Sequence, residues 1–284
     1  MFWAINKQKG DSSFQAIRKF QRENNIKKIG HCGTLDPLAQ GLLIVATNEA
    51  TKLLPYIINQ DKEYICSMRF FASSASYDTD SEVTYLPTRY ISLDELNKAI
   101  NIIKNQTSQI PPIFSAKKIN GKRAYELARQ NIDFELKASD IKIYTFEILD
   151  FNENDFTLTF KTKVSKGTYI RSIVHDLATL LGTDAVMTDL QRTQIGNISL
   201  ENSQKNFKID NYSDLFGINI YAINNTQLNQ LKSKHFFNDN NLKSNNYILI
   251  YNNNLIGIAS CNDGLVQPIK ILWPIVDNFL AKEK

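Results

Sequence analysis

The spacing of apolar residues along the chain predicts several β-strands. Residues 64 to 70 place Tyr, Cys, Met and Phe at every second position, as expected of a strand with one buried face. Residues 42 to 46 form an unbroken apolar run, which is typical of a strand buried on both faces. Two further strands are predicted at residues 141 to 149 and 156 to 162.

Three other segments place apolar residues three or four positions apart, which is the period of a helix. The first helix is predicted to follow Ser12 as its N-cap, and the second to begin at the capping-box pair Ser92 and Glu95. The third covers residues 171 to 181, with Gly182 as its stop. Because helices and strands mix without a regular βαβ repeat, we expect an α+β fold around a mixed sheet. The apolar residues of the first helix are Phe14, Ile17 and Phe20.

Beyond residue 224 the chain is rich in asparagine, and polar stretches separate short apolar runs. We place a domain boundary near residues 206 to 212, which gives a large domain at residues 1–210 and a small module at 211–284. The small module should be rich in β-structure, with residues 252 to 254 as a hairpin turn. Its predicted strands are residues 247 to 251, 255 to 259 and 266 to 272.

Length and composition fit a protein with a sizeable hydrophobic core, since 43% of the 284 residues are hydrophobic. No run of about 18 apolar residues is present, and the first residues lack the order of a signal peptide. We therefore expect no membrane association and a cytoplasmic location. The net charge of +4 is too small to demonstrate a polyanionic partner.

The cysteines and histidines do not predict a metal site. Cys32, Cys66 and Cys261 are odd in number and widely spaced, so we expect three free thiols. The three histidines show no paired-ligand spacing. The sequence also lacks a P-loop and a dinucleotide fingerprint, and we therefore expect neither a metal nor another cofactor.

Basic residues are concentrated between positions 117 and 129, where five stand against the single acid Glu126. The aromatic residues Phe114 and Tyr125 lie next to or within this run. Such a mixture of cations and rings suits phosphate contact and base stacking, whereas an ordinary solvated surface would look the same by charge alone. The five basic residues are Lys117, Lys118, Lys122, Arg123 and Arg129.

Asp36 lies in a glycine-bracketed segment, residues 30 to 41, that follows neither the helix period nor the strand period. Its glycines allow tight turns, and Pro37 keeps Asp36 out of the right-handed helical conformation. We therefore expect Asp36 on a rigid loop, anchored by the buried strand that follows it. Taken alone, an aspartate before proline would only cap a turn.

The segment from Gly30 to Gly41 closely resembles the motif around the catalytic aspartate of the TruB family of tRNA pseudouridine synthases. Five further family motifs are matched in the expected order, which is hard to obtain by chance. Among the departures, Gln8 replaces a usual proline, and Ala75 stands where the family often has a carboxylate. The five motifs lie at residues 7–13, 62–64, 111–129, 165–171 and 190–193.

The resemblance implies both a fold and a reaction. The fold would be a mixed-sheet pseudouridine synthase domain with an RNA-clamping insertion at about residues 107–137, followed by a small PUA-like RNA-binding domain. The reaction would be the isomerisation of uridine 55 in the T-loop of tRNA to pseudouridine, on a flipped-out base and without a cofactor. The expected partner is the T-stem-loop of tRNA. We expect a monomer with no obligate protein partner.

By the same resemblance, three residues carry the chemistry. Asp36 is the nucleophile, and three routes remain open for it: attack at C1′, attack at C6, or removal of a sugar proton. Arg171 is expected to pair with Asp36 and to favour its ionised form, and Tyr64 to pack on the target base. The other matched positions would bind substrate. Tyr169 and Leu190 would line the uracil pocket, and His31 would fill the gap left by the flipped base or stack on the loop. Lys117, Arg123 and Arg129 would contact the phosphates.

Three alternatives remain open at this stage. The chain could be a tRNA-binding folding helper whose catalysis is dispensable, or a related synthase that acts on another RNA. It could also be a glycosidase that pairs Asp36 with Asp78 or Asp80. Such an enzyme needs a second carboxyl group about 5 to 9.5 Å from the first, and the spacing does not indicate one.

Overall fold

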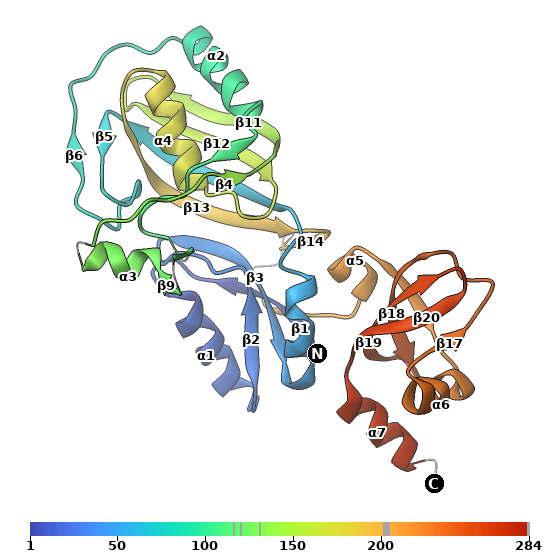
Figure 1. The fold of residues 1–284 in the computed structure, drawn as a ribbon. Coiled ribbons are helices and arrows are strands. Elements are labelled where there is room, and N and C mark those ends of the chain that lie inside the picture. Colours follow the sequence, from blue (N-terminus) through green and yellow to red (C-terminus); the bar gives the residue numbers. More distant parts are fainter. Residues whose placement is uncertain (116, 120, 131, 201–204, 283–284) are drawn as a thin grey trace.

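The protein, described here from a computed structural model, has an α+β fold built around two β-sheets (Figure 1). The structure describes residues 1–115, 117–119, 121–130, 132–200 and 205–282. Within these residues the larger sheet has nine strands: β1 (Phe2–Lys7), β2 (Ile29–Cys32), β3 (Ala39–Thr47), β4 (Lys62–Phe70), β11 (Ile143–Asn152), β12 (Thr157–Val164), β13 (Ala185–Ile195), β14 (Ile198–Ser199) and β15 (Phe207–Ile209).

The larger sheet is mixed. Its main order is β11-β12-β4-β13-β3-β1-β15, with β2 paired to β3 and β14 paired to β13. The pairing of β13 with β3 is parallel, and it places Leu190 opposite Ala39 and Arg192 opposite Gly41. The segment just after Asp36 therefore lies beside a strand that comes much later in the chain.

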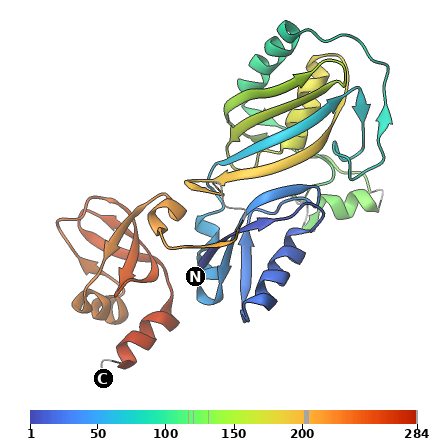
Figure 2. The ribbon, with the colours of Figure 1, turned by 180° about the vertical axis from the view of Figure 1, so that it is seen from behind.

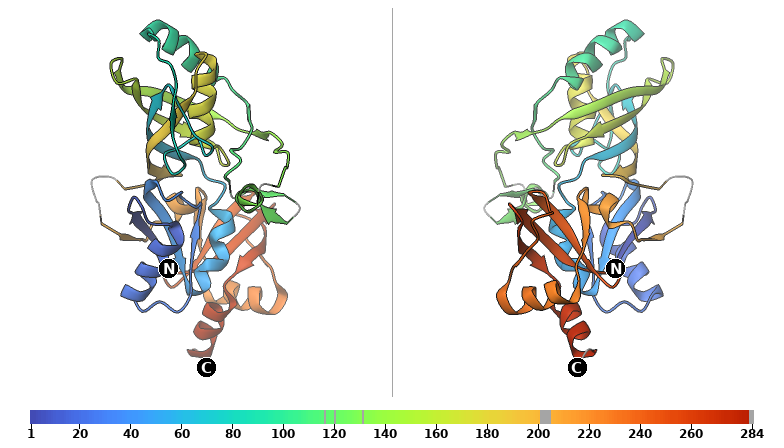
Figure 3. Two further views of the ribbon diagram at one scale, coloured as in Figure 1. Left: turned by 90° about the vertical axis from the view of Figure 1, so that its left-hand side faces the viewer. Right: turned by 90° about the vertical axis from the view of Figure 1, so that its right-hand side faces the viewer.

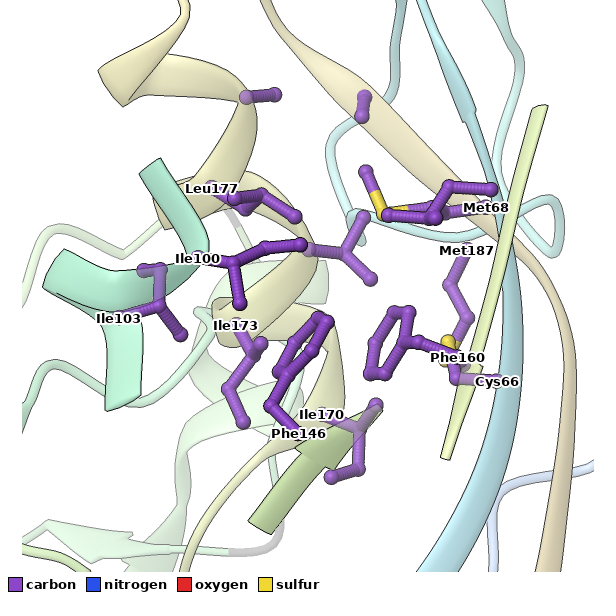
Figure 4. Close-up of a cluster of buried hydrophobic side chains, with 14 of the residues drawn as sticks. Cys66, Met68, Ile100, Ile103, Phe146, Phe160, Ile170, Ile173, Leu177 and Met187 are labelled. Atoms are coloured by element: carbon purple, nitrogen blue, oxygen red, sulfur yellow. The ribbon is translucent and has the colours of Figure 1, made fainter. Parts of the chain in front are cut away.

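One end of this sheet is covered by α2 (Leu93–Lys104) and α4 (Ile170–Leu180). Figure 4 shows their apolar side chains packed against the sheet, where the rings of Phe146 and Phe160 stack with centroids 4.3 Å apart. Removing this apolar surface from water is the main force that fixes the two helices on the sheet. The contributing residues labelled there include Cys66, Met68, Ile100, Ile103, Ile173, Leu177 and Met187.

At the other end of the sheet, β3 contributes side chains to both faces. Leu43 packs in a cluster with α1 (Ser13–Glu23), whereas its neighbour Leu42 packs in a separate cluster with η1 (Asn48–Tyr56). This confirms the prediction of a strand buried on both faces, and it fixes the strand that leaves the Asp36 segment.

The smaller sheet lies in the C-terminal part of the chain, in the order β16-β18-β19-β20-β17. Ile248 and Leu255 of this part share a hydrophobic cluster with Phe2 and Ile44, so the two parts of the chain pack together. The elements are α5 (Tyr212–Phe216), β16 (Asn219–Ala222), α6 (Asn225–Lys234), β17 (Phe237–Asn238), β18 (Asn245–Tyr251), β19 (Asn254–Asn262), β20 (Leu265–Ile271) and α7 (Trp273–Lys282).

Figures 2 and 3 show α2 and α4 at one end of the molecule and α7, with the C-terminus, at the other. We propose the domain division between residues 210 and 211, because β15 is the last strand of the larger sheet and β16 to β20 all follow it. No helix among the described residues is long and apolar enough to cross a membrane.

The insertion begins and ends at a short strand pair, β7 (Ser108–Gln109) with β10 (Ser139–Asp140). Within it, a small hairpin leads into a short helix, and Gly121 supplies the positive φ of the turn. Ala116 and Asn120 of the matched motif lie outside the described residues. The remaining short elements are β5 (Ala72–Ser73), β6 (Thr84–Tyr85), β8 (Lys118–Ile119), β9 (Lys122–Arg123) and α3 (Ala124–Arg129).

Most predicted elements are confirmed, with their ends shifted by a few residues, and Gly182 follows α4 with a positive φ. One expectation was wrong in extent. The rigid loop predicted at residues 30 to 41 is irregular only between Cys32 and Ala39, since its two ends belong to β2 and β3. Backbone hydrogen bonds to β3 form β2 without any need for alternating side chains.

Candidate active site

Asp36 lies in the irregular segment between β2 and β3, and two polar side chains hold this segment in place. Ser13 Oγ accepts a hydrogen bond from Leu35 N at 2.8 Å and donates one to Leu35 O at 2.9 Å. The buried Lys7 ammonium donates to Ala39 O at 2.6 Å. Both side chains belong to the matched motif at residues 7–13. This motif therefore fixes the backbone on either side of Asp36.

Arg192 of β13 holds the same segment from another direction. Its buried guanidinium donates from Nε to Leu42 O and from Nη2 to Gly33 O, each at 2.8 Å. Gly41 has a φ of +101°, and a Cβ there would collide with the carbonyl oxygen of Arg192. Sequence reasoning assigned no role to Arg192, because a buried arginine in a strand is not indicated by any apolar pattern.

The side chain of Arg171, in the first turn of α4, connects Asp36 to two other segments. Its Nη2 lies 2.9 Å from Asp36 Oδ2 and donates to Phe114 O at 3.0 Å. Its Nη1 donates to Ser76 O at 2.9 Å and lies 3.5 Å from Asp78 Oδ2. The arginine side chain is 7% exposed and that of Asp36 is 42% exposed, so the pair consists of a buried cation and an accessible carboxylate.

Asp78 is a site residue whose pairing with Arg171 the sequence did not predict. Its side chain is 3% exposed and accepts hydrogen bonds from Ser76 Oγ at 2.5 Å and from Asp80 N at 3.0 Å. The signal in the sequence was its place three residues after Ala75, where the family often has a carboxylate. With Arg171 and two donors around it, this carboxylate is not placed to serve as the acid of a glycosidase.

Asp36, Asp78 and Arg171 line a cavity of about 700 Å³. The cavity also takes in residues of α1, of the segment that follows Asp78, and of α3 in the insertion. It therefore joins parts of the chain that lie far apart in sequence. The predicted site residues in its lining are His31, Asp36, Arg123, Arg129 and Arg171.

Tyr64, Tyr169, Leu190 and Lys117 are not part of that lining. Tyr64 on β4 and Leu190 on β13 are 8% and 6% exposed, and both belong to the hydrophobic cluster that contains the neighbours of Asp36 in the chain. Their contact with a target base stays a prediction. For such a contact the base would have to reach the edge of this hydrophobic cluster.

Tyr169 is the N-cap residue of α4, two positions before Arg171. Its backbone is fixed by the buried amide of Gln109, which accepts from Tyr169 N at 2.9 Å and donates to Tyr169 O at 3.2 Å. Burial raises the pKa of the Tyr169 phenol, although a hydrogen bond with Ser115 and the Arg171 charge act in the opposite direction.

His31 and Lys117 make contacts of their own within the chain. His31 Nε2 lies 3.2 Å from Thr34 Oγ1, and burial together with the Arg192 charge lowers the pKa of its imidazole. Lys117 Nζ donates to Lys137 O at 2.9 Å and to Ser139 Oγ at 2.6 Å. This ammonium links two parts of the insertion, and its proposed contact with phosphate remains untested.

Asp80 is the third carboxylate in the cavity wall. Burial is the largest cause that raises the pKa of Asp80, and the nearby Asp78 and Asp36 carboxylates raise it further. A hydrogen bond from the Leu38 backbone acts in the opposite direction. Acidic groups are thus crowded in the wall, and the Arg171 guanidinium is the cation that two of them share.

One helical turn after Arg171, His175 forms a polar cluster outside the cavity lining. Its ring stacks on Tyr77, with centroids 4.2 Å apart and planes 7° apart, and its Nδ1 lies 2.9 Å from Asp184 Oδ1. Tyr77 has a φ of +60° and stands between Ser76 and Asp78, both of which contact Arg171. The stack therefore supports the turn that faces the arginine.

This cluster predicts a pH dependence of stability. The hydrogen bond to Asp184 raises the pKa of folded His175 above its unfolded value near 6.5. The stabilisation is fully present below that unfolded pKa and is lost as pH rises through the raised pKa of the folded state. Its size should be at most about 1 kcal/mol, because the pair is partly solvated.

The measurement is the free energy of unfolding in urea between pH 5.5 and 8.5, for the wild type and His175→Gln. The wild type should lose its advantage over the variant across this range. A difference between the two proteins that does not change with pH would contradict the assignment.

The arrangement is suited to carboxylate chemistry on a bound substrate. An aspartate held by a guanidinium can act as a nucleophile or as a base, and the fixed loop keeps its position constant. Among the described residues, no group of three or more His, Cys, Asp or Glu side chains is arranged to hold a metal. The three cysteines are free, as predicted, and all three are buried.

Comparisons with known proteins agree with the sequence motifs. The family model described as TruB family pseudouridylate synthase (N terminal domain) matches residues 21–170. The chain is 38% identical to tRNA pseudouridine synthase B of Mycoplasma mobile, over 100% of this chain and 99% of that protein. It is 42% identical to tRNA pseudouridine synthase B of Ureaplasma urealyticum, over 70% of this chain and 87% of that protein.

Solved structures show the same fold. A chain in the crystal structure of a Cbf5-Nop10-Gar1 complex matches with a TM-score of 0.68 and 18% identity, over 95% of this chain and 84% of that one. A chain in a structure of an H/ACA RNP bound to a substrate RNA containing 2'-deoxyuridine matches with a TM-score of 0.69 and 16% identity, over the same shares. At this identity the likeness establishes the fold alone.

Proposed function

The chain belongs to the TruB family of pseudouridylate synthases, and from this premise we propose that it converts uridine 55 in the T-loop of tRNA to pseudouridine. The observation that carries the proposal is the contact of 2.9 Å between Asp36 Oδ2 and Arg171 Nη2 in the wall of the cavity. It places the carboxylate of the most specific motif beside the arginine of another motif.

In the proposed reaction the N1–C1′ bond of uridine breaks, the uracil turns within the site, and C5 joins C1′. Asp36 acts as a nucleophile at C1′ or C6, or removes a sugar proton, and each route requires the ionised carboxylate. The Arg171 guanidinium lies 2.9 Å from that carboxylate and orients it, and its bonds to Ser76 O and Phe114 O keep it in place when the substrate enters. The reaction is an isomerisation, so it needs no redox partner or group donor.

The target base must leave its loop to reach Asp36, which costs a few kcal/mol of lost stacking. The insertion offers groups that can offset this cost. Tyr125 lines the cavity, and the guanidinium carbons of Arg123 and Arg129 lie 5.8 and 5.7 Å from the centre of its ring. We propose that these two arginines bind phosphates of the T-loop, with Tyr64, Tyr169 and Leu190 contacting the uracil.

The test is tritium release from tRNA transcripts labelled at C5 of uridine, followed by mapping of the modified position. We expect one equivalent of tritium released per tRNA, with modification at position 55 only. A matched transcript with cytidine at position 55 should release none. Release from that transcript at a similar rate would contradict the choice of position.

A role as a tRNA-binding folding helper is compatible with the same cavity, and only inactive variants separate the two roles. We propose that the chain acts as a monomer in the cytoplasm, where its tRNA substrate would be found. The solved relatives include chains in complexes with other proteins. A mass of about twice 32.5 kDa in light scattering would contradict the monomer.

A further inference from the structure

Phe14 is an exposed aromatic side chain on the wall of the active-site cavity. The spacing of Phe14, Ile17 and Phe20 predicts one apolar helix face, but only Ile17 and Phe20 are buried, each at 5% exposure. Phe14 is 58% exposed and lines the cavity that contains Asp36. Burying a phenylalanine would stabilise the fold by about 1.5–3 kcal/mol, and this position forgoes much of that gain.

A cation accompanies the exposed ring. The guanidinium carbon of Arg18, one turn later on α1, lies 4.9 Å from the centre of the Phe14 ring. Arg18 is itself exposed, and its Nη1 donates to Gln21 Oε1 at 2.7 Å, which fixes the direction of its side chain. The ring on the cavity wall thus has a positive charge directly beside it.

This combination matches the chemistry of a single-stranded nucleotide. A nucleobase offers a π-face to any aromatic ring, and its phosphate offers an anion to a neighbouring arginine. The insertion repeats the arrangement in the same cavity, where the guanidinium groups of Arg123 and Arg129 both lie near the Tyr125 ring. Isolated exposed phenylalanines are common, but Phe14 combines an exposed ring with a neighbouring cation and a place in the cavity wall.

We propose that Phe14 and Arg18 form a second stacking site, which holds an unpaired nucleotide next to the flipped uridine. The base stacks on the exposed Phe14 ring, and the Arg18 guanidinium binds a phosphate of the same strand. This inference rests on the proposed function, because it requires RNA in the cavity. On this proposal, the residues of α1 at the cavity contact the RNA substrate directly.

The experiment measures the dissociation constant for unmodified tRNA by filter binding over a range of salt concentrations. Phe14→Ala should weaken binding by about 5- to 150-fold, the range measured for loss of one base stack, and Phe14→Trp should preserve it. Arg18→Gln should reduce the slope of log Kd against log salt by about one, whereas Phe14→Ala should leave that slope unchanged.

The chain offers a matched control. Tyr85 is 70% exposed and has the Arg69 guanidinium carbon 5.5 Å from its ring centre, but neither residue lines the cavity. Tyr85→Ala and Arg69→Gln should therefore leave tRNA affinity and its salt slope unchanged. If Tyr85→Ala weakens binding as much as Phe14→Ala does, the stacking site is overturned.

A base-specific readout completes the test. 2-Aminopurine placed at unpaired positions flanking the target should lose fluorescence on binding to the wild type and to Phe14→Trp, but not to Phe14→Ala. If the wild type makes pseudouridine while Phe14→Ala matches it in affinity and quenching, the stacking site alone is overturned. If the wild type neither binds nor modifies tRNA, both the stacking site and the proposed function fail.

Discussion

Asp36→Asn is expected to abolish pseudouridine formation, with a loss of at least about 10⁴-fold in the single-turnover rate. Asparagine keeps the shape of the side chain, but its amide is neither a nucleophile nor a base. The fold should survive, because Arg171 retains its contacts with Asp78, Ser76 O and Phe114 O and is not left unpaired in the interior. Affinity for tRNA should change by no more than about threefold, since Asp36 is not a phosphate ligand.

The measurement is tritium release under single-turnover conditions, together with the dissociation constant for tRNA. Asp80→Asn is the matched control, because it makes the same chemical change in another carboxylate of the same cavity wall. It should retain activity within about tenfold of the wild type. Residual activity of Asp36→Asn close to that of Asp80→Asn would show that Asp36 does not carry the chemistry.

The same variant separates the enzyme from the folding helper. Asp36→Asn that still binds tRNA and still promotes its refolding would demonstrate a second, binding-only role in the same molecule. A loss of refolding in parallel with the loss of isomerisation would tie both activities to the carboxylate.

Arg171→Lys is expected to lower the single-turnover rate by about 10²-fold or more with little change in tRNA affinity. The arginine uses both terminal nitrogens of its planar group, one toward Asp36 and Phe114 O and the other toward Ser76 O and Asp78. A lysine preserves the charge, but its single ammonium cannot occupy both places. Asp36 would then be held less firmly, and the cost should appear in the rate.

Arg89→Lys is the matched control for this variant. Arg89 also joins a carboxylate, Glu95 Oε1 at 2.9 Å, to a backbone carbonyl, Leu181 O at 2.6 Å, but it does not line the cavity. Its variant should keep the wild-type rate. Melting temperatures of both variants test folding, and a folded Arg171→Lys with a rate within about threefold of the wild type would contradict the need for two-sided contacts.

Local patterns of apolar and capping residues predicted the helices and strands that pack one face against the hydrophobic core. The alternation from Tyr64 to Phe70 gave β4 with its buried face correctly assigned, and the capping residues Ser12 and Ser92 gave the starts of α1 and α2. In each case the signal lies within a few residues of the element. Such local signals predict the folded element correctly because they depend only on the backbone geometry of the element and on which of its faces is buried.

The same reasoning did not find β13, although this strand lies in the middle of the larger sheet. Polar side chains in this strand obscure the alternation of apolar residues. One of them, Arg192, can be buried because its guanidinium donates hydrogen bonds to the carbonyl oxygens of Leu42 and Gly33. Those acceptors come from a distant part of the chain. When a charged residue is buried by partners far away in the sequence, the spacing of apolar residues around it does not indicate that it is buried.

The family motifs in the sequence predicted that Asp36 and Arg171 pair, and their side chains lie 2.9 Å apart. Asp78 was considered only as a possible second acid, whereas the structure pairs it with Arg171. Similarly, the helical period placed Phe14 with the core residues of α1, and the structure leaves it on the cavity wall. Each difference concerns what a side chain faces, not which element carries it.

The sequence by itself determined the family, the α+β class, the place of Asp36 in an irregular segment and the free state of the cysteines, because these depend on short motifs and on residue chemistry. Only the tertiary structure decided which charges are buried, how Arg171 is shared by Asp36 and Asp78, and which side chains line the cavity. The physical reason is that burial and ion pairing are set by the parallel pairing of β3 with β13 and by the packing of α4 against the sheet. These contacts join residues that no local window of the sequence contains.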